Sequence, residues 1–326
     1  MTDLAIVIPA YKETYFARAL ESLANQSCKD FTVYIGDDHS PANLREIVEN
    51  FSGRLDILYT RFDNNIGSEN IVNQWKRCVE LARGEDWIWL FSDDDIADKD
   101  CVTNFYNTRK IQQDRFDVYR FNTCVIDAHD KLTSCTPVGP QVETSEEMAY
   151  YLLMGERGNS MPDHIFRRKT YDLNGGFVFT RYAQAADWAT SILFSREKGI
   201  CIIPGAILYW RVSGQNISSL ATKQKRAMMH GHLDFICWLL KHFKYLEGAK
   251  GKVSYQMIVE AAKRNLVSVL ISHYKGFHVS AVPELFGVFN NTLHMSVRES
   301  LKSLLTVAIN SNPSTLRLYN QVAGKK

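Results

Sequence analysis

The sequence lacks a strong charge of one sign. Its 38 lysine and arginine residues nearly balance 36 aspartate and glutamate residues, so the formal net charge of the 326 residues is only +2. A chain with so little net charge has no broad field that would attract nucleic acid or an acidic polymer, and neither is expected as its main partner. With 45% hydrophobic residues, the chain can nevertheless bury a large α/β domain with an appendage, or two domains.

The cysteines lack the spacing of a metal or redox site. They are odd in number, scattered, and never arranged as Cys-x-x-Cys, which argues against a zinc site or a thioredoxin-like centre. This pattern favours a reducing compartment. The seven are Cys28, Cys78, Cys101, Cys124, Cys135, Cys201 and Cys237.

The start of the sequence lacks the features of a secretory leader. The apolar segment 4–10 is too short to span a membrane, has no basic region before it and follows Asp3. We therefore predict a first strand here and a cytoplasmic protein, with a peripheral position on the inner face of the membrane as an open alternative.

Short apolar runs alternate with helical periodicity up to about residue 125, a pattern typical of βα units that feed a mostly parallel sheet. The residues that follow, to about 220, are less regular, and the sequence then becomes continuously helical. We predict a doubly wound, Rossmann-like α/β domain over residues 1–220 and a helical region over 221–326. The predicted strands are 4–9, 31–36, 55–61, 86–92, 118–122, 163–167 and 206–211, and the predicted C-terminal helices are 228–245, 255–274, 283–295 and 297–309.

Two helices of this domain are predicted from apolar residues that fall on one helical face. The first such face is formed by Phe16, Ala19, Leu20 and Leu23, and the second by Ile71, Trp75, Cys78, Val79 and Ala82.

Acidic side chains follow two of the predicted strands. Asp93, Asp94 and Asp95 come directly after an apolar strand, and Asp37 and Asp38 follow another. Ligands of such sheets collect at the carboxyl ends of the strands, and Mg²⁺ or Mn²⁺ binds there through carboxylates and substrate phosphates. The pattern predicts a diphosphate site with a divalent cation, with Asp38 placed to accept a hydrogen bond from a base or ribose. A solvated acidic turn that caps the next helix is the alternative.

Several ordered motifs between residues 4 and 219 resemble the family 2 glycosyltransferases, which have the GT-A fold. Residues 5–13 are similar to the family's opening nucleotide-binding strand and loop. Residues 37–40, Asp-Asp-His-Ser, are similar to its Asp-Asp-x-Ser motif, and residues 65–67 are similar to its Asn-x-Gly loop. The resemblance implies nucleotide contacts at Pro9, Ala10, Tyr11, Glu13, Asp38 and Asn65.

Residues 90–96 resemble the DXD segment of the same family. The resemblance implies that Asp94 is a metal ligand, that Asp95 can contribute to the same site, and that Asp93 lies near the ribose. The sequence departs from the usual motif at Ser92, which stands where the first aspartate of the motif is common.

Two later segments also match family motifs. Asp187 corresponds to the catalytic base, although Ala186 replaces the usual acidic neighbour. Residues 209–213 match a stretch that often ends in a histidine, and Ser213 stands in the histidine's place. Arg211 then becomes the candidate that neutralises the leaving diphosphate, with a salt bridge at a strand edge as the alternative.

The resemblance implies a glycosyltransferase that moves a sugar from a nucleoside-diphosphate sugar to an acceptor hydroxyl with Mg²⁺ or Mn²⁺. A UDP-sugar is favoured, and GDP- and dTDP-sugars stay open. A base at Asp187 without a second carboxylate nucleophile favours inversion at the anomeric carbon. The family context implies a saccharide or lipid-linked acceptor in bacterial polysaccharide or glycolipid synthesis.

Two other functions compete with this interpretation. The departures at Ser92, Ala186 and Ser213 favour a degenerate nucleotide-sugar-binding module without turnover. A sugar-phosphate nucleotidyltransferase would need a glycine-rich phosphate loop after the first strand, where this sequence has Pro9 and Tyr11 instead. The apolar stripe of residues 228–245 is expected to be core or a homodimer contact, with a peripheral membrane contact as the alternative.

Overall fold

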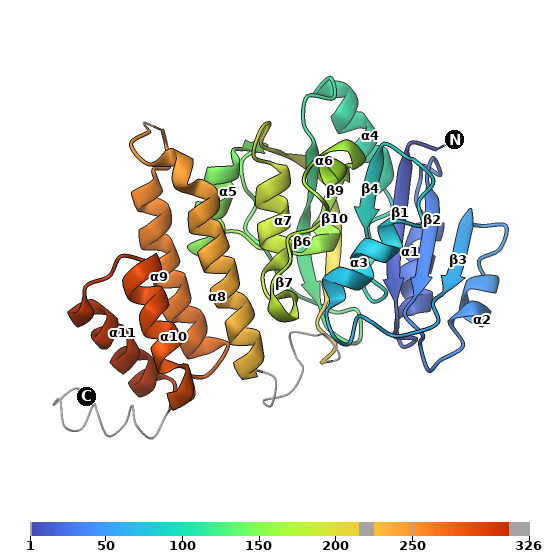
Figure 1. Cartoon of the computed structure of the whole chain (residues 1–326). Helices are drawn as coiled ribbons and strands as arrows, with labels where there is room; N and C mark the ends of the chain where they lie inside the picture. Colours follow the sequence, from blue (N-terminus) through green and yellow to red (C-terminus); the bar gives the residue numbers. More distant parts are fainter. Residues whose placement is uncertain (1, 215–224, 250, 313–326) are drawn as a thin grey trace. The chain divides into compact units, whose positions relative to one another are not determined.

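The computed structural model describes residues 2–214, 225–249 and 251–312 (Figure 1). The chain divides into two compact units. The first comprises Met1–Met148, Glu156–Phe179 and Ala186–Ser219, and the second comprises Ala149–Gly155, Thr180–Ala185 and Leu220–Lys326. The boundary predicted between residues 220 and 221 lies outside the described residues. Two short pieces of the second unit come from the part of the sequence assigned to the first domain.

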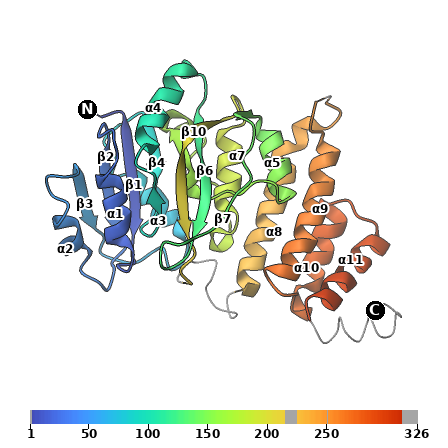
Figure 2. The same ribbon diagram turned by 180° about the vertical axis from the view of Figure 1, so that it is seen from behind.

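A mixed sheet forms the centre of the first unit (Figures 1 and 2). Within the described residues it has the order β3-β2-β1-β4-β9-β6-β10-β5, with β7 beside β6 and β8 beside β10. The strands β1 to β4 are parallel, and so are β6 and β10, whereas β9 and β5 run antiparallel to their neighbours. The strands are β1 Leu4–Ala10, β2 Thr32–Asp37, β3 Ile57–Arg61, β4 Trp87–Leu90, β5 Ile96–Ala97, β6 Val118–Ile126, β7 Leu132–Cys135, β8 Val142–Glu143, β9 His164–Arg167 and β10 Ile200–Arg211.

Helices cover both faces of this sheet. The right-handed crossover rule places α1 and α2 on one face and puts α3, which returns the chain from β3 to β4, on the other. Figure 1 shows α3 in front of the sheet, and Figure 2, seen from behind, shows α1 in front of it. The helices are α1 Phe16–Ala24, α2 Leu44–Glu49, α3 Ile71–Val79, α4 Cys101–Ile111, α6 Arg168–Leu173 and α7 Ala186–Phe194, while α5 Ser145–Leu153 ends in the second unit.

The structure confirms the predicted α/β class and the buried face of α1. All four apolar residues predicted for that face are buried. The predicted face of α3 is partly wrong, because Val72 and Gln74 are buried in place of Ile71 and Trp75. The Gln74 amide donates a hydrogen bond to the Gly36 carbonyl at 3.0 Å, so a polar residue takes a core position that apolar periodicity does not reveal.

Aromatic packing fixes the strand that precedes the acidic residues. Every residue of β4 is buried, and the Trp89 ring contacts Phe91 and Phe121 at centroid distances of 5.2 and 5.0 Å. Its indole N–H donates to the Pro162 carbonyl at 2.7 Å. Each buried aromatic side chain removes roughly 150–250 Å² of its surface from water. This packing holds β4 in place and therefore fixes the start of the turn that follows it.

The second unit consists largely of helices (Figure 1). The apolar side chains Phe235, Leu239 and Phe243 of the predicted stripe are fully buried, so these three belong to the core of the second unit. No helix within the described ranges is both long and apolar enough to cross a bilayer. The helices are α8 Lys225–His242, α9 Tyr255–Ser272, α10 Val282–Gly287, a π-helical turn Val288–Thr292, and α11 Val297–Asn310.

Two of the scattered cysteines form a disulfide. Cys124 on β6 and Cys135 on β7 stand directly opposite each other in an antiparallel hairpin and are bonded. The other five cysteines are free. Sequence spacing did not indicate this pair, because the partners are 11 residues apart and only the register of the hairpin brings them together.

Candidate functional site

The candidate site begins where the strand order reverses. The strands β2 and β3 are added to the sheet on one side of β1, and β4 is then added on the other side. Such a reversal of strand order opens a crevice at the carboxyl ends of the two strands that flank it, here β1 and β4. The loop after β1 meets the acidic turn, residues 92–95, at this place. The backbone N–H groups of Tyr11 and Lys12 both donate to Asp93 Oδ2, at 2.9 and 2.8 Å. Asp93 therefore joins the two strand ends.

Lys12 carries a positive charge into the acidic turn. Its Nζ donates to Asp94 Oδ2 and lies 3.2 Å from Asp93 Oδ1. Burial raises the pKa of Asp94, and the charge of Asp93 adds to this rise while Lys12 opposes it. Burial alone would lower the pKa of Lys12, but Asp93 and Asp94 outweigh it and raise that pKa above its usual value. Lys12 is therefore protonated and neutralises part of the acidic turn.

Asp95 points away from this ion pair and into the protein. It is 1% exposed, and its Oδ1 accepts a hydrogen bond from the backbone N–H of Arg211 at 2.8 Å. Burial, followed by the charge of Asp94, raises the pKa of Asp95 well above the usual value. Within the described ranges no three His, Cys, Asp or Glu side chains are arranged to hold a metal ion by themselves.

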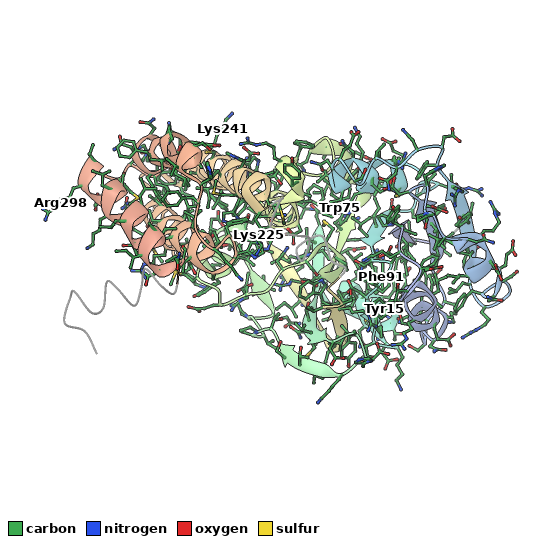
Figure 3. All side chains as sticks on the ribbon, turned by 90° about the horizontal axis from the view of Figure 1, so that it is seen from below. Tyr15, Trp75, Phe91, Lys225, Lys241 and Arg298 are labelled. Atoms are coloured by element: carbon green, nitrogen blue, oxygen red, sulfur yellow. A yellow bond between two sulfur atoms is a disulfide. The ribbon has the colours of Figure 1, made fainter. Side chains whose placement is uncertain are left out.

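Arg211, at the end of β10, supports the acidic turn from inside. Its side chain is fully buried, and Nε donates to the Asp94 carbonyl at 2.7 Å. Nη1 donates to the Asp127 carbonyl at 3.0 Å and pairs with Asp130 Oδ1 at 2.5 Å. The guanidinium carbon lies 4.3 Å from the ring centre of Tyr15, which Figure 3 labels together with Phe91. This arginine connects β10, the β6–β7 turn and the acidic turn.

Asp38 closes the loop of residues 65–67. Its carboxylate accepts the backbone N–H groups of Ile66 and Gly67, each at 2.9 Å, and forms an ion pair with Arg77. Arg77 in turn lies over the Phe62 ring, with 3.8 Å between the guanidinium carbon and the ring centre. Arg77 lies in the last turn of α3, so the ion pair with Asp38 connects this helix to the end of β2.

An open hollow lies beside this loop. It has a volume of about 510 Å³, and we call it the Tyr11 hollow after the ring that is 43% exposed in it. Arg61 at its wall is anchored by Asp37 Oδ2 at 3.1 Å and by the Ser40 carbonyl at 2.7 Å. The hydroxyl of Ser40 donates to the Tyr11 carbonyl at 2.7 Å. Its lining residues are Tyr11, His39, Ser40, Pro41, Arg61, Asn65 and Ser68.

Of these lining residues, Tyr11 and Asn65 are predicted from the sequence, whereas Arg61 is not. Arg61 is the last residue of β3, so the strand-end rule that led to the acidic turn could have found it. Asn65 also caps its own turn, because its Oδ1 accepts the N–H of Ser68 at 2.9 Å.

Three further predicted contacts belong to the first strand and its loop. Pro9 lies in β1 opposite Gly36, and the carbonyl of the buried Ala10 accepts the N–H of Asp38 at 2.9 Å. The side chain of Glu13 is exposed, and its carbonyl accepts the N–H of Phe16 at 3.1 Å at the start of α1.

Asp187 lies in the first turn of α7. Its side chain is partly exposed, and burial raises its pKa to about 7 against hydrogen bonds from the Trp188 backbone and the Asn159 side chain. The negative charge of Asp163 contributes to the raised pKa of both Asp187 and Asp95.

The fold is similar to that of solved structures of one bacterial protein. TarS from S. aureus, residues 1–349 in complex with UDP, matches with a TM-score of 0.56 and 17% identity over 94% of this chain and 90% of that one. The same protein in complex with UDP-GlcNAc matches with a TM-score of 0.60 and 16% identity over 99% and 92% of the two chains. At this level of identity the likeness establishes the fold.

The family follows from a match of the sequence to a family model. Among individual curated proteins, none matches this sequence significantly. The family described as "Glycosyl transferase family 2" matches residues 5–167, a segment that contains the β1 loop, Asp38, the Tyr11 hollow and the acidic turn. Because this match spans half of the chain and the GT-A-type fold agrees with it, the chain belongs to glycosyl transferase family 2.

Proposed function

We propose that the chain transfers a sugar from a nucleoside-diphosphate sugar to an acceptor hydroxyl, with a UDP-sugar as the donor. The observation that carries the proposal is the direct connection between the Tyr11 hollow and the acidic turn. Tyr11 lines the hollow, and its backbone, with that of Lys12, is bonded to Asp93. A nucleoside in the hollow would thus direct its diphosphate toward the ammonium and carboxylates of the turn. The UDP and UDP-GlcNAc complexes of TarS support a uridine donor.

In this proposal the β1 loop and the loops beside it hold the nucleoside. The exposed Tyr11 ring offers a face on which a base can stack. Asn65 and Arg61 offer polar groups at the edge of the hollow. Asp38 acts through the 65–67 loop, whose two backbone N–H groups it binds.

A divalent cation, Mg²⁺ or Mn²⁺, fits beside Asp93 and Asp94. The position of Lys12 supports this fit, because its ammonium is a cation that Asp93 Oδ1 and Asp94 Oδ2 already hold between them. One or two carboxylates completed by substrate phosphates form a common Mg²⁺ site. Such a cation, when bound, would stabilise the negative charge of the departing diphosphate. Since Asp95 is turned inward to the Arg211 N–H, we assign Asp95 and Arg211 the task of holding the turn in place.

Asp187 is the proposed base that takes the proton from the attacking acceptor hydroxyl. A carboxylate with a pKa of about 7 is well matched to proton transfer at neutral pH, because the best catalytic pKa lies near the working pH. In this assignment Asp187 acts on the acceptor and no carboxylate is assigned as a nucleophile toward the sugar, which favours direct displacement with inversion.

The acceptor we propose is a saccharide or a lipid-linked saccharide in polysaccharide or glycolipid synthesis. A cytoplasmic location stays a prediction from the sequence. A contact of the C-terminal helices with a membrane surface or with a second copy also stays a prediction.

A calorimetric titration with UDP, GDP, dTDP and ADP, each with and without Mn²⁺, tests the proposal. We expect UDP to bind most tightly and Mn²⁺ to strengthen its binding. In Asp94→Asn the strengthening by Mn²⁺ should disappear, whereas Asp100→Asn, a charge change beyond the acidic turn, should behave as wild type. Absence of binding for all four nucleotides would contradict the proposal. Binding of UDP without UDP release from any UDP-sugar would instead favour the degenerate module.

A further inference from the structure

Lys12 occupies the space between two carboxylates of the acidic turn. Its ammonium contacts Asp94 Oδ2 and Asp93 Oδ1, while Asp93 Oδ2 is already bound by two backbone N–H groups. The Lys12 side chain is 26% exposed, and the carboxylates beside it are 7% and 6% exposed. The pair is thus largely shielded from water and already has a cationic partner.

A divalent cation at this place would need the same oxygens. The third carboxylate of the turn is engaged elsewhere through Asp95 Oδ1, which accepts the Arg211 N–H. Two like charges held this close in a shielded position repel each other strongly. The ammonium and the divalent cation therefore exclude each other from the Asp93–Asp94 pair.

We propose that Lys12 is an internal counter-ion that competes with the divalent cation for Asp93 and Asp94, and that the released ammonium then pairs with the donor diphosphate. Lysine suits both positions, since its ammonium is a compact charge on a flexible stem and a frequent phosphate ligand. Lys12 is then a positioning residue that makes cation binding depend on the nucleotide. The second half of this inference rests on the proposed nucleoside-diphosphate donor.

The coupling follows from thermodynamic linkage. Without nucleotide, the cation must displace Lys12 with no new partner for the ammonium, so the cation binds weakly. With a diphosphate present, the displaced ammonium gains a partner, so nucleotide and cation strengthen each other's binding by the same factor.

Mn²⁺ binding followed by electron paramagnetic resonance of the free ion tests the competition without any turnover. In the absence of nucleotide, we expect Lys12→Met to bind Mn²⁺ at least about tenfold more tightly than wild type, because the competing charge is gone. Lys12→Arg keeps the charge and should bind Mn²⁺ as weakly as wild type. Lys99→Met, which removes an exposed charge near the start of α4, should also match wild type. Lys12→Gln covers the case in which the methionine variant does not fold.

The same titration with UDP present tests the coupling. UDP should raise the Mn²⁺ affinity of wild type by a larger factor than that of Lys12→Met. Equal or weaker Mn²⁺ binding by the Met and Gln variants, or no Mn²⁺ binding by any chain, would overturn the inference. If UDP changes Mn²⁺ affinity in no chain while Lys12→Met still binds Mn²⁺ more tightly, the counter-ion role stands and the nucleotide donor of the proposed function fails.

Discussion

Four aspartates at the site differ in what surrounds each carboxylate. Asp93 and Asp94 face the Lys12 ammonium, and Asp95 lies beneath them with the Arg211 N–H. Burial is the largest cause of the raised pKa of Asp187, and hydrogen bonds from the Trp188 backbone and the Asn159 side chain oppose it. Carboxylates whose pKa values are pushed apart by their environments are typical of sites that divide acid, base and charge-holding tasks. This contrast is the basis for assigning Asp187 as the base.

Asp187→Asn should lower the transfer rate by about 10²- to 10⁴-fold, the usual contribution of a general base. Binding of UDP should not change, because Asp187 is assigned to the acceptor side. In wild type, kcat/KM should rise with pH up to about 7 and then level off, since the base must lose its proton. Steady-state rates across this pH range provide the measurement. Asp172→Asn, an exposed charge change on α6, is the control, and a parental rate in Asp187→Asn would rule out the assignment.

The same carboxyl group should also reduce stability at high pH. The pKa of Asp187 is about 7 in the folded chain and near 4 in the unfolded chain, so the folded state binds more protons between these values. Stability contributed by the neutral carboxyl is then lost as the pH rises from about 4 to about 7. Thermal unfolding should give Asp187→Asn a higher Tm than wild type at pH 8, with the advantage shrinking toward pH 4. Identical Tm values at pH 8 would show that Asp187 is not held in this environment.

Arg211 and Arg18 both pair with Asp130 but differ in burial. The Arg211 side chain is fully buried, whereas that of Arg18 is 52% exposed. Arg211→Met should cost about 1–3 kcal/mol of unfolding free energy, because it leaves the carbonyls of Asp94 and Asp127 without their donor. Arg18→Met should cost less than about 1 kcal/mol, as is usual for an exposed pair. Denaturant unfolding of the two variants measures the difference, and equal losses would show that the buried network does not support the turn.

At the scale of elements, the loops after β1, β2 and β4 meet because parallel strands end at the same edge of the sheet. This could be predicted, since the apolar strands and the acidic residues behind them are local features of the sequence. The inward turn of Asp95 could not be predicted, because its partner, Arg211, lies 116 residues away. The partner of Cys124 depends on hairpin register, and the buried Gln74 depends on a carbonyl of β2.

Gly67→Ala should disturb the loop that Asp38 closes. A Cβ at this position would lie 2.5 Å from Asp38 Oδ2, so the carboxylate or the loop must move, at a cost of about 1–3 kcal/mol. We expect UDP affinity to fall about tenfold, because a loss of roughly 1.4 kcal/mol of binding energy corresponds to that factor. Gly251→Ala, where the nearest atom to a new Cβ would lie at 3.6 Å, should leave the affinity unchanged. Calorimetric titration of both variants with UDP measures the difference. A Gly67→Ala variant that binds UDP as tightly as wild type would show that the loop held by Asp38 does not contribute to nucleotide binding.

At the scale of the whole molecule, the strand order fixes where chemistry can occur. Between β1 and β4 the connections of the parallel strands depart to opposite sides, and the β1 loop meets the acidic turn at that reversal. The change to continuous helix after residue 220 led us to predict a second, helical part of the chain, which stays a prediction. The assignment of Ala149–Gly155 and Thr180–Ala185 to the second unit could not, because it reflects contacts with helices far along the chain.

A crystal structure of the chain soaked with UDP and Mn²⁺ would show whether the nucleotide and the cation bind together at the ends of β1 and β4. We predict the uracil ring in the Tyr11 hollow, the diphosphate beside Lys12, and an anomalous manganese peak against the Asp94 carboxylate. Uridine bound away from the ends of β1 and β4, or manganese bound at a different group of side chains, would contradict this prediction.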